Sequence, residues 1–240
     1  MIVGRQPPGQ TAIRAVITDI DGTLTDRDRR IVPAAADLLH RLEVAGIPIV
    51  LATGNVLPIA LAIHRSLGLS GPIVAENGGL VYSLRDGREH VERLADRRIA
   101  LRAYRRLKSA GMPVRRLFTD RWRETEVALE PTVSVLEIRR HLRGIPVAIE
   151  STGFALHLIQ QGRGKLPALH RALQPLGLAV SDCLVAGDGD NDVPMLKASA
   201  WGISFASASP RARKAADYVS ASNSTDGFVE GLKASQLVLF

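Results

Sequence analysis

Two aspartates spaced two residues apart follow the first apolar stretch of the chain, in the sequence VITDIDGTLTD at residues 16 to 26. If this stretch is a strand, side chains at positions i and i+2 point to the same side, which brings Asp19 and Asp21 together. Two like charges about 4 Å apart repel by roughly 4 kcal/mol at an effective dielectric constant of about 20. A pair of carboxylates placed in this way indicates a site that also holds positive charge.

Three further segments carry polar groups suited to binding phosphate. Thr53 in LATGN offers a hydroxyl group, and Lys165 in GRGK stands at the start of an expected helix. The segment VAGDGDNDVPM contains Asp188 and Asp192. Taken alone, each has an ordinary structural explanation, since such residues are common in turns, helix caps and solvated surfaces. However, ligands of open α/β sheets bind at the carboxyl ends of the strands, where these segments are expected, so we interpret them as one site.

This set of side chains suits phosphoryl transfer assisted by a divalent cation. Oxygen ligands alone favour Mg²⁺, which keeps waters and a substrate phosphate in its coordination shell. Asp19 can then attack phosphorus to form an aspartyl-phosphate, while Asp21 protonates the leaving alcohol and later deprotonates the attacking water. Thr53 and Lys165 can stabilise the transferring phosphoryl oxygens. The carboxylates expected around Mg²⁺ are those of Asp19, Asp21, Asp188 and Asp192.

Alternating strand and helix patterns carry these residues in the two flanks of the chain. Near-continuous apolar strands are expected at 13–19, at 47–53 and in PIVAENGG, separated by helices in VPAAADLLHRLEVAG and NVLPIALAIHRSLG. The alternation resumes with a helix at 164–177, a strand in DCLVAGD, a helix in VPMLKAS and a strand in WGISFA. This order predicts a parallel sheet covered by helices on both faces.

The middle of the chain, from about 86 to 156, has a different pattern. Helices are expected at 91–109 and 131–143, and the segments PVRRLFTD, ETEVALE, IPVAIE and FALHLI suggest an antiparallel sheet, so we predict a small α+β insertion. Of the net charge of +7, residues 85 to 150 account for +6. Because acidic residues are interleaved there and no nucleic-acid-binding motif occurs, the charge favours a small anionic ligand or a solvated face over nucleic acid.

The composition bounds the class of protein. Apolar residues make up 46% of the chain, but its longest apolar segments fall well short of the roughly 20 residues that span a bilayer. The N-terminal residues contain no apolar stretch of signal-peptide length. Cys183 is the one cysteine and is expected to be a buried thiol without a disulfide. These features predict a cytoplasmic protein.

The segments DIDGT, LATGN, the lysine of GRGK, and GDGDND resemble the four motifs of the haloacid dehalogenase-like phosphatases. The resemblance covers residues 13–83 and about 158–230. It implies a doubly wound, Rossmann-like parallel-sheet core at residues 1–85 and 157–240. It further implies an α+β cap domain inserted after the third strand, at residues 86–156.

The resemblance also implies roles for single residues. It makes Asp19 the nucleophile and Asp21 the acid and base, with Asp21 contacting Mg²⁺ partly through its carbonyl oxygen, and it makes Lys165 a contact to the substrate. Within the superfamily, GNVLPIALAIHRSLGLSGPIVAENGG and TDRWRE look like archaeal-type phosphoglycolate phosphatases. One departure is Asn55, which stands where many capped members carry Arg after Thr-Gly, and this weakens any substrate borrowed from sugar phosphatases.

We therefore predict a Mg²⁺-dependent phosphomonoester hydrolase that acts through an aspartyl-phosphate and converts 2-phosphoglycolate to glycolate and phosphate. The alternative is a sugar-phosphate or mannosyl-type phosphatase of the same superfamily, because the core motifs do not decide the substrate. A phospho-receiver domain is disfavoured, since its extra acidic residues precede the phosphorylated aspartate. The expected partner is a small phosphorylated substrate, with no nucleic acid and no membrane, and a homodimer is compatible with the sequence.

Recognition of the substrate carboxylate is expected to involve the insertion. TDRWRE sets Arg121 and Arg123 two residues apart, and hence on one side of the chain if the stretch is extended. Because Arg can bind a carboxylate through two parallel hydrogen bonds, at least one of them is expected to lower KM for phosphoglycolate. The alternative is that both are solvated surface residues.

Overall fold

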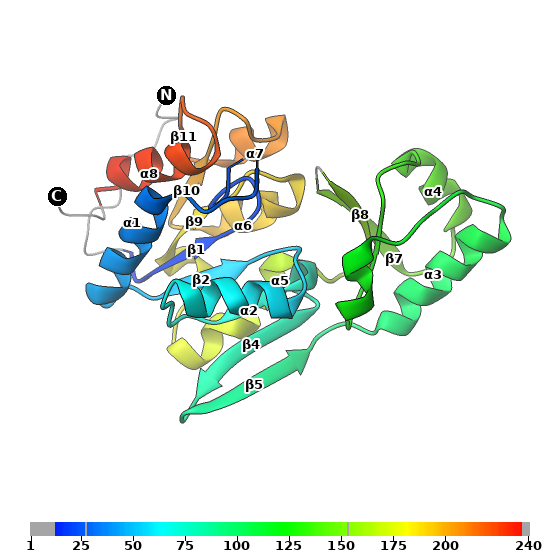
Figure 1. The fold of residues 1–240 in the computed structure, drawn as a ribbon, viewed down its shortest axis with the longest axis horizontal. Coiled ribbons are helices and arrows are strands. Elements are labelled where there is room, and N and C mark those ends of the chain that lie inside the picture. Colours follow the sequence, from blue (N-terminus) through cyan, green and yellow to red (C-terminus); the bar gives the residue numbers. More distant parts are fainter. Residues whose placement is uncertain (1–12, 27, 153, 237–240) are drawn as a thin grey trace.

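A computed structural model of the chain describes residues 13–26, 28–152 and 154–236, which form two lobes (Figure 1). In these residues the larger lobe is built on a sheet of eight strands in the order β11-β10-β9-β1-β2-β3-β4-β5. Pairing is parallel from β11 to β3, and β4 and β5 are antiparallel to their neighbours. The strands are β1 (Ala15–Thr18), β2 (Ile49–Ala52), β3 (Ile73–Ala75), β4 (Leu80–Arg85), β5 (Arg88–Arg93), β9 (Cys183–Ala186), β10 (Trp201–Ser204) and β11 (Tyr218–Val219).

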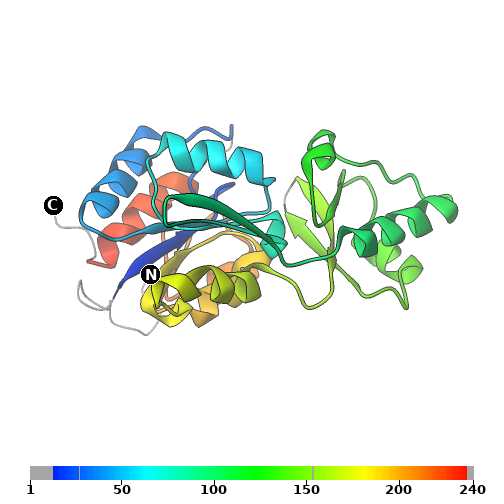
Figure 2. The same cartoon turned by 90° about the horizontal axis from the view of Figure 1, so that it is seen from below.

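Helices cover both faces of the large sheet, as Figure 2 shows. The strands β1, β2 and β9 are buried on both faces, which is why they are apolar runs without polar alternation. The predicted parallel sheet covered by helices is confirmed. One face packs against α1 (Pro33–Val44), α2 (Leu57–Ser66) and α8 (Ser224–Ala234). The other face packs against α5 (Lys165–Leu173), α6 (Val193–Ala198) and α7 (Pro210–Ala215).

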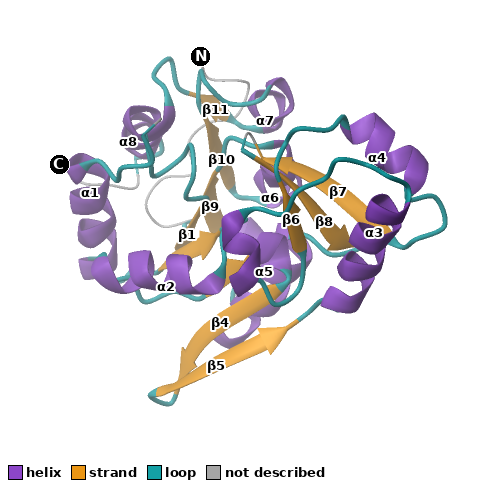
Figure 3. Cartoon of the chain, turned by 45° about the vertical axis from the view of Figure 1, so that its right-hand side comes forward, coloured by secondary structure: helices purple, strands orange, loops and turns teal. Residues whose placement is uncertain are grey.

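The smaller lobe has its own antiparallel sheet and its own core (Figure 3). Its strand order is β6 (Val127–Leu129), β8 (Ala155–Gln160) and β7 (Val147–Thr152). Two helices, α3 (Arg97–Ser109) and α4 (Val135–His141), pack on this sheet. Figures 1 and 2 show both helices on the outer side, so the other face of the small sheet is turned toward the larger lobe.

The two sheets do not divide at the residues expected from the sequence. β5 pairs with β4 along its whole length and belongs to the large sheet, although 86 was expected to open the insertion and 91 to open a helix. Asp86 and Gly87 make the reversal, with φ of 50° and 71° as in a two-residue hairpin turn. Likewise β8 is the central strand of the small sheet, although residue 157 was expected to return to the core. We therefore propose a cap domain that runs from the end of β5 to the start of α5.

Two expectations from composition concern Cys183 and the membrane. Cys183 is free and buried, and burial followed by the nearby charge of Asp182 raises the pKa of its thiol to about 12. A thiol so reluctant to ionise is a core side chain rather than a nucleophile. In the part of the chain that the structure describes, no helix combines the length and apolarity needed to cross a membrane.

Candidate active site

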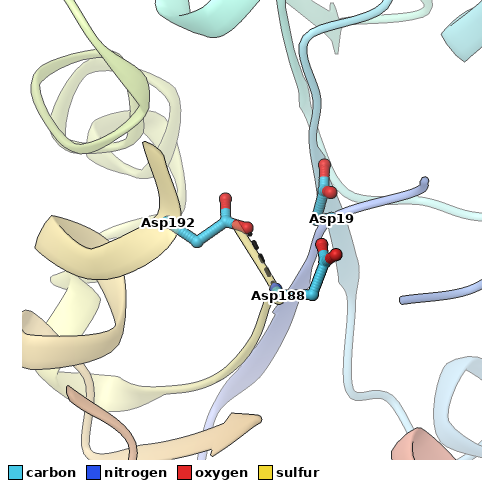
Figure 4. A group of neighbouring side chains, drawn as sticks. All are labelled: Asp19, Asp188 and Asp192. Carbon is cyan, nitrogen blue, oxygen red and sulfur yellow. Dashed lines mark hydrogen bonds between the residues drawn. The ribbon is translucent and has the colours of Figure 1, made fainter. Parts of the chain in front are cut away.

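Three aspartates converge at the carboxyl ends of β1 and β9, which lie side by side in the large sheet. These strands pair in parallel with Thr18 opposite Ala186, so the segments that follow them leave the sheet side by side. One carboxylate oxygen from each of Asp19, Asp188 and Asp192 lies within 4.8 Å of the others (Figure 4). Three oxygen donors at this spacing are suitable ligands for a hard divalent cation.

The loop after β9 turns Asp192 back toward the site. A single 3-10 turn at Asp190–Asp192 reverses the chain. Oδ2 of Asp192 then accepts hydrogen bonds from the backbone N–H groups of Asp188 at 3.1 Å and Gly189 at 2.9 Å. Figure 4 shows the first of these bonds as a dashed line. The carboxylate is therefore held by the loop that also carries Asp188.

Lys165 joins the three aspartates from the first residue of α5. Its Nζ donates to Oδ1 of Asp19 at 2.8 Å and to Oδ1 of Asp192 at 2.6 Å, and its side chain is 1% exposed. Burial alone would lower the pKa of this ammonium group, but the carboxylates of Asp19 and Asp192 raise it above its ordinary value. Lys165 is therefore a fixed positive charge inside the site.

One lysine does not balance three crowded carboxylates. Burial raises the pKa of Asp19 well above its ordinary value, and this rise persists although Lys165 opposes it. Burial and then the charge of Asp192 raise the pKa of Asp188 to about 7. Both shifts disfavour the charged carboxylates, and a divalent cation would favour them. The residues therefore fit a bound metal ion.

Asp21 is not one of these three aspartates, although its charge adds to the raised pKa of Asp188. β1 ends before Asp19, and the chain then coils, with the N–H of Leu24 donating to the carbonyl of Ile20 at 2.9 Å. Asp19 and Asp21 follow this strand rather than lie in it, so strand alternation does not place their carboxylates. Oδ2 of Asp21 instead accepts a hydrogen bond from Nδ2 of Asn55 at 2.5 Å. The expected contact of its carbonyl oxygen with Mg²⁺ stays a prediction.

Thr53 closes β2 at the same edge of the sheet. Its side chain is fully buried, and its Oγ1 accepts a hydrogen bond from the backbone N–H of Asn55 at 3.0 Å. Its carbonyl oxygen accepts another from the N–H of Asn77, also at 3.0 Å. These bonds shape the loop that carries Gly54 and Asn55 beside the aspartates. The contact of Thr53 with a phosphoryl oxygen stays a prediction.

A cavity of about 750 Å³ opens above the aspartates, between the two lobes. Its floor is formed by the loops after β1 and β9, including Asp19, Asp21 and Asp188. The small lobe closes it with the turn between β7 and β8, through Ser151, Thr152 and Phe154. Sequence reasoning missed these three residues, because a hairpin turn in the insertion carries no recognisable motif.

The segment TDRWRE does not face this cavity as expected. Residues Phe118–Trp122 form a 3-10 helix rather than an extended chain, so Arg121 and Arg123 do not share a side. Arg121 is exposed and stacks on two aromatic rings of the same turn. Arg123 is buried, where its Nη1 donates to the carbonyl of Gly54 at 2.9 Å and to the carboxylate of Glu126. Arg121 and Arg123 therefore do not form an extended pair, and a role of either one in lowering KM for phosphoglycolate stays a prediction.

Buried polar residues instead tie the two lobes together beside the cavity. The carboxylate of Glu126 accepts hydrogen bonds from Nη1 of Arg123 and, at 3.0 Å, from Nδ2 of Asn77 in the large lobe. It also lies 2.8 Å from Nδ1 of His157, whose Nε2 is 3.0 Å from Oγ1 of Thr152 on the cavity wall. This junction links the loops after β2 and β3, through Gly54 and Asn77, to the side of the small lobe that faces the cavity. No local pattern in the sequence indicated it.

The chain matches the model of the haloacid dehalogenase-like hydrolases over residues 16–122 and 129–232. A protein of Methanothermobacter thermautotrophicus named phosphoglycolate phosphatase is 35% identical over 221 residues, which are 92% of this chain and 98% of that protein. A protein of the same name from Methanoculleus marisnigri is 37% identical over 233 residues, which are 95% of this chain and 99% of that protein. A crystal structure from Thermoplasma acidophilum has a TM-score of 0.85 at 27% identity, and the match covers 94% of this chain and 99% of that chain.

These matches extend through both flanks and the insertion, so they cover the site and the lobe above it. They agree with a carboxylate cluster bridged by a buried lysine at the strand ends of a parallel sheet. The chain belongs to the haloacid dehalogenase-like hydrolase family, and it is a phosphatase.

Proposed function

We propose that this phosphatase hydrolyses 2-phosphoglycolate with the help of Mg²⁺ and through an aspartyl-phosphate on Asp19. The observation that carries the reaction is the buried cluster of three carboxylates in which Lys165 bridges Asp19 and Asp192. The substrate is supported by the relatives named phosphoglycolate phosphatase, which are 35% and 37% identical over nearly the whole chain. Phosphatases of this family generally use a divalent metal, and the acidic cluster suits one.

Asp19 supplies the nucleophile in the first step. One of its carboxylate oxygens forms a bond to phosphorus while the bond between phosphorus and the ester oxygen breaks. Lys165 and the hydroxyl of Thr53 lie at the same edge of the sheet, where they would stabilise the charge on the phosphoryl oxygens. A bound Mg²⁺ would be held by Asp19, Asp188 and Asp192 and would supply further positive charge at those oxygens.

Asp21 moves the proton in both steps. Its carboxylic acid gives a proton to the ester oxygen, so the leaving group departs as the neutral alcohol of glycolate. The resulting carboxylate then takes a proton from water, whose oxygen attacks phosphorus and releases free Asp19 and inorganic phosphate. Asn55 donates to Oδ2 of Asp21 at 2.5 Å and so orients the carboxyl group toward the cavity.

A panel of small phosphate esters tests this proposal. We expect the highest kcat/KM for 2-phosphoglycolate, slower hydrolysis of an aryl phosphate, and loss of all turnover in excess EDTA that added Mg²⁺ restores. Undiminished turnover in EDTA would overturn the metal-assisted reaction. A clear preference for sugar phosphates would replace the proposed substrate with a sugar-phosphate or mannosyl-type ester and leave the reaction unchanged.

We also propose that the protein acts in the cytoplasm on this small substrate as a homodimer. Size-exclusion chromatography with light scattering distinguishes a monomer from a dimer.

A further inference from the structure

We propose that Arg29 binds the carboxylate of the substrate, and that Phe154 of the small lobe stacks on its guanidinium to hold it over the cavity. This inference rests on the proposed function, which requires a group that recognises a carboxylate next to the phosphate. Among the described residues on the cavity wall, the arginines are Arg29 and Arg211. Arg211 donates to Oδ2 of Asp190 at 3.1 Å, whereas Nε of Arg29 lies 3.9 Å from Oδ1 of Asp21.

The position of Arg29 matches the geometry of phosphoglycolate. If Asp21 protonates the ester oxygen, that oxygen lies within about 3 Å of the Asp21 carboxyl group. The carboxylate carbon of phosphoglycolate is two covalent bonds away from the ester oxygen, and each bond is about 1.5 Å long. The substrate carboxylate must therefore lie within a few ångströms of Asp21, where the Arg29 guanidinium already stands.

The loop that carries Arg29 holds it in a defined turn. Oδ1 of Asp26 accepts hydrogen bonds from the N–H groups of Asp28 at 2.8 Å and Arg30 at 2.9 Å. The backbone carbonyl oxygen of Asp26 accepts another from the N–H of Arg29 at 3.0 Å. Arg29 has φ of 61°, a left-handed conformation that residues other than glycine adopt rarely. Such a conformation persists only where the surrounding bonds impose it, and it is frequent at binding sites. The turn thus presents Arg29 to the cavity before substrate arrives.

The ring of Phe154 lies against the guanidinium of Arg29 without occupying its hydrogen-bond donors. The guanidinium carbon lies 4.3 Å from the centre of the Phe154 ring. A stacked guanidinium keeps its N–H groups in its own plane, at the edge of the stack, where they can form two parallel hydrogen bonds with a carboxylate. The contact joins the large lobe to the small lobe at Phe154, the residue before β8.

A matched pair of substrates isolates the carboxylate. 2-Phosphoglycolate and 2-hydroxyethyl phosphate have the same length but differ by one negative charge. In Arg29→Gln we expect kcat/KM for 2-phosphoglycolate to fall by about 10- to 100-fold, mainly through KM, because a charge-assisted contact is lost. For 2-hydroxyethyl phosphate we expect a change of less than about threefold. Arg29→Lys should recover part of the loss, since Lys keeps the charge but not the paired donors.

Arg30→Gln is the matched control, because Arg30 is the next residue and its exposed side chain faces Asp28 at 3.9 Å. It should change neither substrate. Phe154→Leu should raise KM for 2-phosphoglycolate by a smaller factor than Arg29→Gln. Equal losses on both substrates in Arg29→Gln would overturn the inference, because Arg29 would then act on Asp21. An unchanged preference in Arg29→Gln, or a loss seen in Arg211→Gln instead, would also overturn it.

The same measurements separate this inference from the proposed function. If the wild-type protein turns over 2-hydroxyethyl phosphate or sugar phosphates as well as 2-phosphoglycolate, the proposed substrate is wrong and the inference falls with it. If the wild type prefers 2-phosphoglycolate and Arg29→Gln keeps that preference, the proposed function stands and only the role of Arg29 is wrong.

Discussion

The floor and the roof of the cavity are built differently. The floor consists of charged groups that are buried and bonded to one another, such as Lys165 with its side chain 1% exposed between Asp19 and Asp192. The opposite wall, which we call the roof, consists of Ser151, Thr152 and Phe154 of the small lobe together with Arg29, which extends from the loop after β1 with its side chain 58% exposed. Charges act strongly where water is excluded and weakly where it is not. We therefore propose that the floor carries the chemistry and the roof selects the substrate.

The difference between floor and roof has a direct consequence for mutations. A change in the floor should impair every phosphate ester, because all of them share the phosphoryl group. A change in the roof should impair only those esters whose remaining part it contacts. The junction around Glu126 lies between these extremes, since it positions the roof without touching the phosphoryl group.

The largest effect is expected for Asp19→Asn. An amide cannot attack phosphorus, so kcat should fall by at least about 1,000-fold on every ester. The fold should persist, because the substitution removes a carboxylate whose raised pKa already marks its charge as unfavourable in the buried site. Turnover assays and circular dichroism check both statements. Near-normal turnover in Asp19→Asn would rule out a covalent intermediate on this residue.

Lys165→Ala should come next, with a loss of about 100- to 1,000-fold in kcat on all esters. It removes a positive charge that lies among phosphoryl-binding groups and leaves two buried carboxylates without their partner. Lys197→Ala is the control, since Lys197 is an exposed lysine on α6. A loss confined to 2-phosphoglycolate in Lys165→Ala would mean that this lysine recognises the substrate carboxylate instead of the phosphoryl group.

Glu126→Gln should mainly affect stability. The ion pair of Glu126 with Arg123 is buried on both sides, so breaking it should lower the free energy of unfolding by about 3 kcal/mol at pH 7. Urea denaturation measures this loss. Glu124→Gln is the control, because Glu124 pairs with Arg93 at the surface and should contribute less than about 1 kcal/mol. Equal stability of the two variants would mean that the junction does not hold the lobes.

Glu126 should also make the stability of the folded protein depend on pH. Burial alone would raise the pKa of Glu126, but His157 and Arg123 outweigh it and lower the pKa below its ordinary value of 4.5. A carboxyl group with a lowered pKa in the folded state stabilises fully above its unfolded pKa and loses that contribution as the pH falls through the folded pKa. Below about pH 4.5 the wild type should therefore lose stability more steeply than Glu126→Gln.

The smallest effect is expected for Asn55→Ala. Loss of the hydrogen bond to Asp21 should reduce kcat by about tenfold, because the acid is still present but less well oriented. The loss should be similar for 2-phosphoglycolate and 2-hydroxyethyl phosphate, since both need the same proton. A loss on 2-phosphoglycolate alone would instead assign Asn55 to recognition of the carboxylate.

The floor of the site was predictable because each of its parts is local. Asp19, Lys165 and Asp188 each follow or begin an element whose periodicity is visible in the sequence, and parallel strands bring their carboxyl ends to one edge. The expected place of Asp21 rested on strand alternation, but β1 ends at Thr18, before both aspartates. At Asp86, an Asp-Gly pair between two strand-like segments is the signal for a hairpin, although residue 86 was expected to open the α+β insertion.

By itself, the sequence determined the parallel sheet, the motif residues and the kind of reaction, because strand and helix periods and the spacing of charged residues act over a few positions. Only the tertiary structure decided which arginines line the cavity. Arg123 meets Gly54, and Arg29 meets Phe154, across many residues of intervening chain. Such contacts depend on how the two lobes pack, and packing between lobes leaves no period in the sequence.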